Sequence, residues 1–135
     1  MHNAKLILVA LVTGVLLAGH QSQAEGQTSD AGADVFRRCM ACHQVGPSAR
    51  NGVGPVLNGS VGRHAGTHPG YPYSAAMRNS GLVWDEQTLT RYLRAPRDVV
   101  PGTKMAFAGL KDDRDIADVI AYLKQFGEEG QRVHE

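Results

Sequence analysis

The chain has 135 residues, of which 42% are hydrophobic and 20% charged, and its formal net charge is +1. This composition is typical of one small globular domain and excludes a largely disordered chain. The near-equal numbers of basic and acidic residues give no electrostatic support for nucleic-acid binding.

The first 24 residues have the pattern of a secretory signal peptide. A short start with Lys5 precedes an apolar run at residues 6–18, and a small-x-small cleavage site ends at Ala24. The run is about 13 residues, shorter than the roughly 20 needed to cross a bilayer, so we expect cleavage rather than a retained membrane anchor. Cleavage removes Lys5, one of the 14 basic residues, and leaves 13 against 13 acidic ones.

The exported chain is predicted to contain one domain, at residues 31–127, between a flexible lead-in at 25–30 and a frayed tail at 128–135. The domain begins with a helix over residues 31–40 that Ser29 or Asp30 can cap, because apolar residues recur there at helical spacing. Residues 44–72 hold many glycines and prolines and are therefore predicted to form a long loop.

Three further helices are predicted. One covers residues 73–80 and ends at Gly81, and the next covers 85–95 and is stopped by Pro96. After a second loop, the last helix begins at the cap Asp112 and ends at Gly127, with an apolar repeat of Ile116, Val119, Ile120 and Leu123. No strand pattern is present, so we expect an all-α protein whose few apolar residues need an additional source of core.

The stretch "RRCMACHQVGP" holds both cysteines of the chain, Cys39 and Cys42, followed directly by His43. A disulfide between them would close a very short loop and stabilise little. A thioredoxin-type motif needs a βαβ context, and a zinc site needs further ligands. The spacing C-x-x-C-H predicts covalent haem attachment, with two thioethers to the haem and the histidine on the iron. A haem would also supply the missing core.

A second iron ligand would distinguish an electron carrier from an enzyme or sensor with an open iron. Met105 is favoured because it lies in a loop far along the chain from His43, although methionine more commonly fills gaps in a core. The candidates for this second ligand are the side chains of Met40, Met77, Met105, His64, His68 and His134.

Five motifs, in order along residues 31–126, resemble class I c-type cytochromes, most closely the bacterial cytochrome c2 group and its mitochondrial relatives. They are "GADVFRRCMACH", "GVGPVLNGSVGRHAG", "YPYSAAMRNSGLVWDEQTL", "YLRAPRDVVPGTKMAFAGL" and "DIADVIAYLKQF". The resemblance implies a small all-α cytochrome c fold, with about four to five helices and long loops wrapped around one covalent haem c.

The resemblance also implies residue roles. Cys39 and Cys42 would form the thioethers, and His43 and Met105 would be the axial ligands. The Pro55 carbonyl would accept a hydrogen bond from the His43 ring. Tyr73, Trp84 and Arg63 would lie at a haem propionate, and Tyr92 and Thr103 would lie near Met105. The first and last helices would cross at Gly32, Phe36 and Tyr122. Two departures from mitochondrial members stand out: Met77 replaces an asparagine, and only Lys104, Lys111 and Lys124 remain of a lysine-rich docking face.

Together these features predict a monomeric periplasmic electron carrier rather than an enzyme. The expected partners are redox complexes met transiently: a quinol-oxidising complex or dehydrogenase as donor, and a terminal oxidase, peroxidase or photosynthetic reaction centre as acceptor. Contact with a membrane would occur only through such partners. The alternatives are an open-iron enzyme or gas sensor, such as a peroxidase, and a docking subunit that co-purifies with a membrane oxidase.

Overall fold

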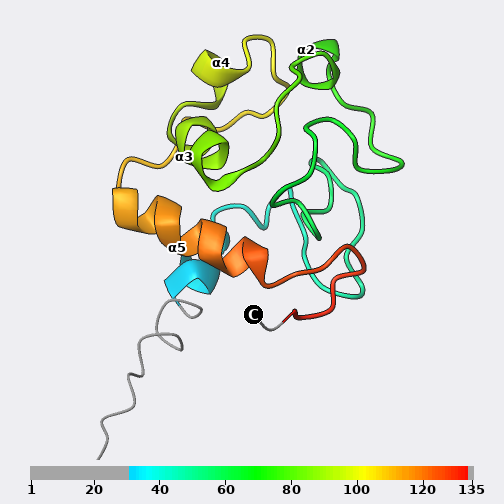
Figure 1. The fold of residues 1–135 in the computed structure, drawn as a ribbon, viewed down its shortest axis with the longest axis vertical. Coiled ribbons are helices and arrows are strands. Elements are labelled where there is room, and N and C mark those ends of the chain that lie inside the picture. The colour runs from blue at the N-terminus through cyan, green and yellow to red at the C-terminus, as the bar shows by residue number, and fades with distance from the viewer. Residues whose placement is uncertain (1–30, 134–135) are drawn as a thin grey trace, which may run out of the picture.

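The computed structural model describes residues 31–133 (Figure 1). The predicted signal peptide, the predicted lead-in with Ser29 and Asp30, and His134 lie outside the described residues. None of the helices in the described part is long and apolar enough to span a membrane.

The all-α prediction is confirmed, because the described residues form helices joined by loops and contain only two isolated β-bridges. Residues 31–36 are helical and continue as turns to residue 42. The labelled helices follow in the order α2 (Ala75–Arg78), α3 (Glu86–Arg94), α4 (Pro96–Val99) and α5 (Asp113–Lys124).

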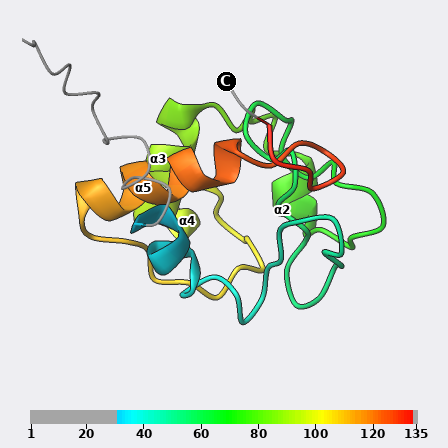
Figure 2. The ribbon, with the colours of Figure 1, turned by 90° about the horizontal axis from the view of Figure 1, so that it is seen from below.

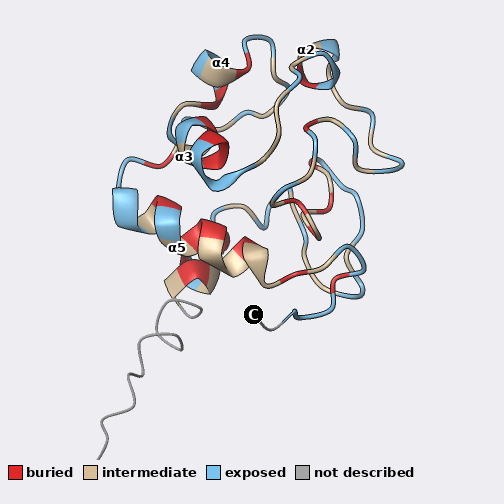
Figure 3. Cartoon of the chain, viewed as in Figure 1, coloured by how far each residue is buried: buried red, intermediate tan, exposed pale blue. Residues whose placement is uncertain are grey.

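Side-chain caps set the starts of the two long helices. Asp85 accepts a hydrogen bond from the Thr88 amide at 2.7 Å before α3, and Asp112 accepts from the Arg114 amide at 2.7 Å before α5. Such caps satisfy amides that have no partner within the helix. The predicted apolar repeat of α5 is buried in full, as Figure 3 shows in red along its inner face.

Pro96 does more than the sequence analysis predicted. It was expected only to stop the preceding helix, and a loop was expected after it. Instead α3 ends at Arg94, Ala95 adopts an extended conformation with φ −151°, and Pro96 begins the short helix α4. Proline suits the first position of a helix because its fixed φ is helical and it has no N–H left unpaired.

The predicted crossing of the first and last helices is confirmed. A Cβ added to Gly32 would lie 2.6 Å from Tyr122 Cβ, so only glycine allows this approach. The rings of Phe36 and Tyr122 are 5.3 Å apart at the same crossing. In Figures 1 and 2 the N-terminal helical segment and α5 lie across each other, with α3 beside them.

The buried apolar residues form two separate clusters. The first lies between the N-terminal helix, α3 and α5 and includes Val35, Leu89 and Ile116. The second lies beside α2 and α4 and is formed by Ala65, Met77, Tyr92 and Val100. Trp84 packs against both clusters. The apolar core is therefore divided, and Trp84 connects its two parts.

The predicted frayed tail is wrong for the residues that the structure describes. Residues 126–133 fold back as a hairpin, with Phe126 and Arg132 paired in an antiparallel bridge. The Val133 amide donates to the Gln125 carbonyl at 2.8 Å. The composition of this segment is polar, but its backbone hydrogen bonds and one buried glycine, Gly130, hold it against the domain.

Candidate haem-binding site

The attachment motif lies in a tight turn that follows the first helix. The amides of Cys42 and His43 both donate to the Cys39 carbonyl, at 3.0 and 2.9 Å. Cys39 is half-buried and packs against the first cluster, whereas Cys42 is exposed. Burial raises the pKa of the Cys39 thiol, an effect that the nearby Arg38 partly offsets. The turn therefore presents two thiols and an imidazole from one short segment.

The ring of His43 is held in one orientation by the backbone. Its Nδ1 lies 2.7 Å from the Pro55 carbonyl, to which the ring N–H donates. Gly54 lies against the ring, because an added Cβ would be 2.5 Å from His43 Cε1. Burial lowers the pKa of the imidazole, and the bond to Pro55 acts in the opposite direction. With Nδ1 engaged, Nε2 is left as the nitrogen that can bind a metal.

Met105 is presented by a loop on the side of the second cluster. It is half-buried and packs against that cluster. The Tyr92 hydroxyl donates to its sulfur at 3.5 Å and lies 3.4 Å from the Thr103 hydroxyl. Burial raises the pKa of Tyr92, so the phenol remains a hydrogen-bond donor near neutral pH. The structure thus brings together Tyr92, Thr103 and Met105.

The other sulfur and imidazole groups are placed differently. Met40 is 60% exposed within the attachment turn. Met77 is buried in α2, in the same cluster against which Met105 packs. His64 is exposed and His68 half-buried in the long loop. Met77 belongs to the cluster against which Met105 packs, so it is the natural comparison for the role of Met105.

Comparison with known proteins identifies the family. The family model for cytochrome c matches residues 29–127. The chain belongs to the cytochrome c family. It is 54% identical over 119 residues to a cytochrome c2 of Rhodomicrobium vannielii, covering 88% of this chain and 94% of the relative. It is 48% identical over 123 residues to a cytochrome c2 of Blastochloris viridis, covering 90% and 97% of the two chains.

Solved structures give the same family. Cytochrome cH from Methylobacterium extorquens superposes with a TM-score of 0.68 at 46% identity, over 72% of this chain and 97% of that one. Cytochrome c2 from Rhodospirillum centenum superposes with a TM-score of 0.70 at 40% identity, over 73% and 98%. The expected resemblance to class I cytochromes and the small cytochrome c fold are therefore confirmed, and the chain is a haem c electron carrier by family.

The residues of this cytochrome fit one covalently bound haem c. The thiols of Cys39 and Cys42 are in one turn, and the free nitrogen of His43 follows them directly. Cys39 packs against the first cluster and Met105 against the second. A haem held at both places would lie between the clusters and supply apolar surface at their junction, which agrees with the expectation of a cofactor that completes the core.

Arg63, Tyr73 and Trp84 form a connected group in the cytochrome. The Trp84 amide donates to the Arg63 carbonyl at 2.9 Å, and the rings of Trp84 and Tyr92 are 4.7 Å apart. Burial raises the pKa of Tyr73, while hydrogen bonds to the His68 backbone and the Arg63 side chain act against it. The Arg63 guanidinium itself donates to the Asn58 carbonyl at 2.8 Å. The propionate role of Arg63, Tyr73 and Trp84 remains a prediction.

The sequence did not predict the hydrogen bonds that connect the loops of the cytochrome. The Tyr71 hydroxyl donates to the Val53 carbonyl at 2.6 Å. Lys104 Nζ donates to the Pro72 carbonyl at 2.5 Å and lies 5.6 Å from the centre of the Tyr71 ring. These contacts connect the segment after His43 with the residue next to Met105. No periodic pattern signals them, because their acceptors are backbone carbonyls in irregular loops.

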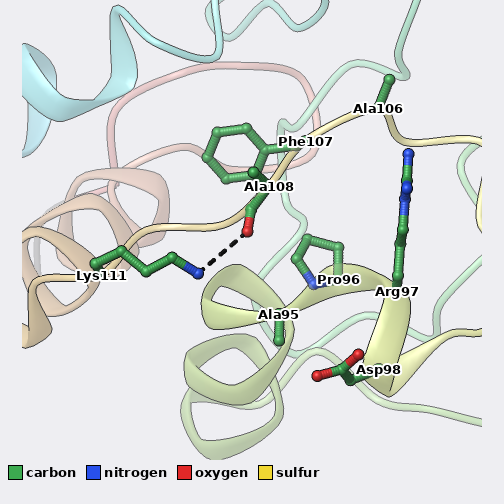
Figure 4. A pocket seen from close by; sticks show the side chains of 8 residues that line it. All are labelled: Ala95, Pro96, Arg97, Asp98, Ala106, Phe107, Ala108 and Lys111. Atoms are coloured by element: carbon green, nitrogen blue, oxygen red, sulfur yellow. Dashed lines mark hydrogen bonds between the residues drawn. The ribbon is translucent and has the colours of Figure 1, made fainter.

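A surface hollow lies next to the Met105 loop, between α4 and the segment that follows the methionine. Its lining is formed by Ala95, Pro96, Arg97, Asp98, Ala106, Phe107, Ala108 and Lys111. In Figure 4, Lys111 and Arg97 lie on opposite sides of the hollow, with Pro96 and Ala108 between them. Lys111 Nζ donates to the Ala108 carbonyl at 3.4 Å. The hollow therefore combines apolar side chains with two cations, Arg97 and Lys111, and one acid, Asp98.

Proposed function

We propose that this cytochrome is a soluble periplasmic carrier whose haem iron is bound axially by His43 and Met105. The observation that carries the proposal is the presentation of two ligand atoms from two separate loops. His43 Nδ1 is fixed by Pro55 at 2.7 Å, and the Met105 sulfur is 3.5 Å from the Tyr92 hydroxyl. The export pattern at residues 1–24 supports the periplasmic location.

The haem, when bound, takes up and releases one electron at its iron. The protein residues keep the surroundings of the iron alike in both redox states: Pro55 and Gly54 restrict the His43 ring, and Tyr92 holds the Met105 side chain. With a histidine and a thioether as ligands, no axial position is left for a substrate. Histidine–methionine ligation raises the reduction potential, so we expect a high-potential carrier and not an enzyme.

The expected partners are redox complexes that bind briefly. The hollow beside Met105 offers Phe107 and Ala108 as apolar side chains, and its charged lining residues are Arg97, Lys111 and the single acid Asp98. Such a surface suits a small interface with an acidic-faced partner, of the size found in transient electron-transfer complexes. A quinol-oxidising complex or dehydrogenase would donate electrons, and a terminal oxidase, peroxidase or reaction centre would accept them. The carrier acts as a monomer.

The ligand set is tested by spectroscopy of the purified holoprotein. We expect the ferric form to show the weak near-red absorption band of methionine bound to iron, and both redox forms to resist cyanide and carbon monoxide. Rapid binding of either ligand by the wild-type protein, without the near-red band, would identify an open iron and favour the peroxidase-like alternative. Stoichiometric co-purification with a membrane oxidase would instead favour the docking-subunit alternative.

A further inference from the structure

The C-terminal residues form a hairpin that reverses the chain after α5. The Gly130 amide donates to the Gly127 carbonyl at 2.9 Å, and the Gly127 amide donates to the Gln131 carbonyl at 2.9 Å. The Val133 amide closes the base of the hairpin on the Gln125 carbonyl at 2.8 Å. In Figures 1 and 2 this segment, drawn in red, returns beside the loop that follows the attachment turn.

Arg132 fastens the hairpin to the end of α5. Its guanidinium lies 4.6 Å from the centre of the Phe126 ring and 5.5 Å from the centre of the Tyr122 ring. It also donates a hydrogen bond to the Gln125 side chain. A guanidinium over aromatic faces is an attractive contact. The hairpin is therefore attached to the aromatic residues at the end of α5, beside the helix crossing.

The tip of the hairpin presses on the loop between His43 and Ser60. Gly130 is buried, and a Cβ added to it would lie 2.6 Å from Asn58 Nδ2 and closer still to the Gly46 carbonyl. The Gly59 amide donates to the Phe126 carbonyl at 3.0 Å. Backbone from the chain end and backbone from the loop are therefore in direct contact.

The region under the hairpin is the base of the loop that holds His43. Asn58, 5% exposed, accepts from the Gly46 amide at 2.8 Å and donates to the Gly46 carbonyl at 2.9 Å. The Leu57 amide then donates to the Gln44 carbonyl at 3.0 Å, and the Gly54 amide to the Cys42 carbonyl at 2.9 Å. These bonds bring Pro55 back to His43.

We propose that the C-terminal hairpin, residues 126–133, is a clasp that positions His43. By covering the Gly46–Asn58 pair it keeps the two sides of the loop together, and the loop in turn keeps the Pro55 carbonyl on the imidazole. Gly130 is the positioning residue, since no other residue fits between the hairpin and Gly46. This role rests on the proposed function only in that His43 is taken as the iron ligand.

The test compares two glycine substitutions in the holoprotein. Gly130→Ala adds a methyl group at φ +80° against the Gly46 backbone, and Gly81→Ala adds one at φ +67° with nothing within 4 Å. Both variants carry the backbone strain, and only the first displaces the hairpin. A chain that ends at Gly127 removes most of the hairpin without a clash. A chain that ends at Val133 is its control.

Two quantities are measured. The first is the rate of amide hydrogen exchange in the reduced protein, and the second is the NMR chemical shift of the His43 ring protons in the ferric protein. We expect Gly130→Ala and the chain ending at Gly127 to accelerate exchange at Gly54 and Leu57 by about tenfold or more. Exchange at Leu110, whose amide donates to Leu93 at 2.8 Å on the Met105 side, should stay unchanged. The His43 ring shifts should move in the same two variants and in neither control.

Two results would overturn the clasp. One is unchanged exchange at Gly54 and Leu57, and the other is equal acceleration at Leu110, which would make the hairpin a general stabiliser only. The ligand assignment is decided separately: ferric wild-type protein without hyperfine-shifted histidine ring protons would disprove His43 ligation. Exchange at Gly54 and Leu57 would still report whether the hairpin holds the loop.

Discussion

The two regions that carry the proposed axial ligands are built differently. On the His43 side, the ring is held by a backbone carbonyl, a glycine in contact and a loop closed by backbone hydrogen bonds. On the Met105 side, the sulfur is held by the Tyr92 hydroxyl and by packing against a cluster that includes a second methionine, Met77. A substitution near His43 must fit against backbone atoms that cannot move away, whereas each side chain that contacts Met105 can be replaced without altering the others. The histidine side is therefore the rigid one and the methionine side the adjustable one.

The largest effect should come from weakening the attachment of the haem, which would connect the two regions. Cys42→Ala would delete one thioether, and with it part of the attachment of a haem that would lie between the two clusters. We expect a strongly reduced yield of holoprotein, because such a divided core does not fold well without the haem. The measurement is the ratio of haem absorbance to protein in periplasmic extracts. Normal amounts of folded, haem-free Cys42→Ala protein would contradict this view of the core.

Removal of Met105, the proposed second axial ligand, should disturb the fold less than loss of a thioether but should open the sixth position of the iron. Met105→Ala should retain the haem, lose the near-red band, lower the reduction potential and allow carbon monoxide to bind the ferrous form. Met77→Ala is the matched control, since it removes a thioether from the same cluster. It should cost about 2–5 kcal/mol of stability as a core truncation and leave the band in place. The opposite pattern would transfer the ligand role to Met77.

The rigidity of the histidine side can be tested by adding one methyl group next to the His43 ring. In Gly54→Ala the new Cβ would lie 2.5 Å from the His43 ring, whereas in Gly52→Ala the nearest atom, the Cys42 carbonyl oxygen, is 3.7 Å away. We expect Gly54→Ala to lower the free energy of unfolding by about 1–3 kcal/mol through overpacking, and Gly52→Ala to have little effect. Denaturant titration of both holoproteins measures the difference. Equal stabilities would show that the histidine region can adjust.

The smallest effect on the protein itself should come from the charges beside the methionine loop. Lys111→Glu reverses a charge at the hollow, and we expect slower electron transfer to an acidic-faced partner, with the difference shrinking as salt is added. The reduction potential should barely move. Lys104→Glu should act alike but also lose the bond to the Pro72 carbonyl. The measurement is the bimolecular rate over a salt series. A rate insensitive to both substitutions would place docking on another face.

The sequence predicted those features that follow from periodicity or spacing. The apolar repeat of α5 and the cap Asp112 appear as expected, and C-x-x-C-H was sufficient to predict the cofactor. The short helix α4 was missed because Pro96 both ends one helix and starts another. The hairpin at residues 126–133 was missed because many of its contacts are backbone hydrogen bonds and the close approach of Gly130 to Gly46, which leave no periodic pattern in the sequence. Asn58 lay unnoticed in a glycine-rich loop for the same reason.

Trp84 is the sole tryptophan of the chain, and it packs against both apolar clusters. An excited indole passes its energy to a nearby haem, and the efficiency falls steeply with distance. An indole at the junction of the clusters should therefore be almost dark in the folded holoprotein and should fluoresce when the clusters separate. Trp84 fluorescence would thus report separation of the two clusters as a function of time, without any added label.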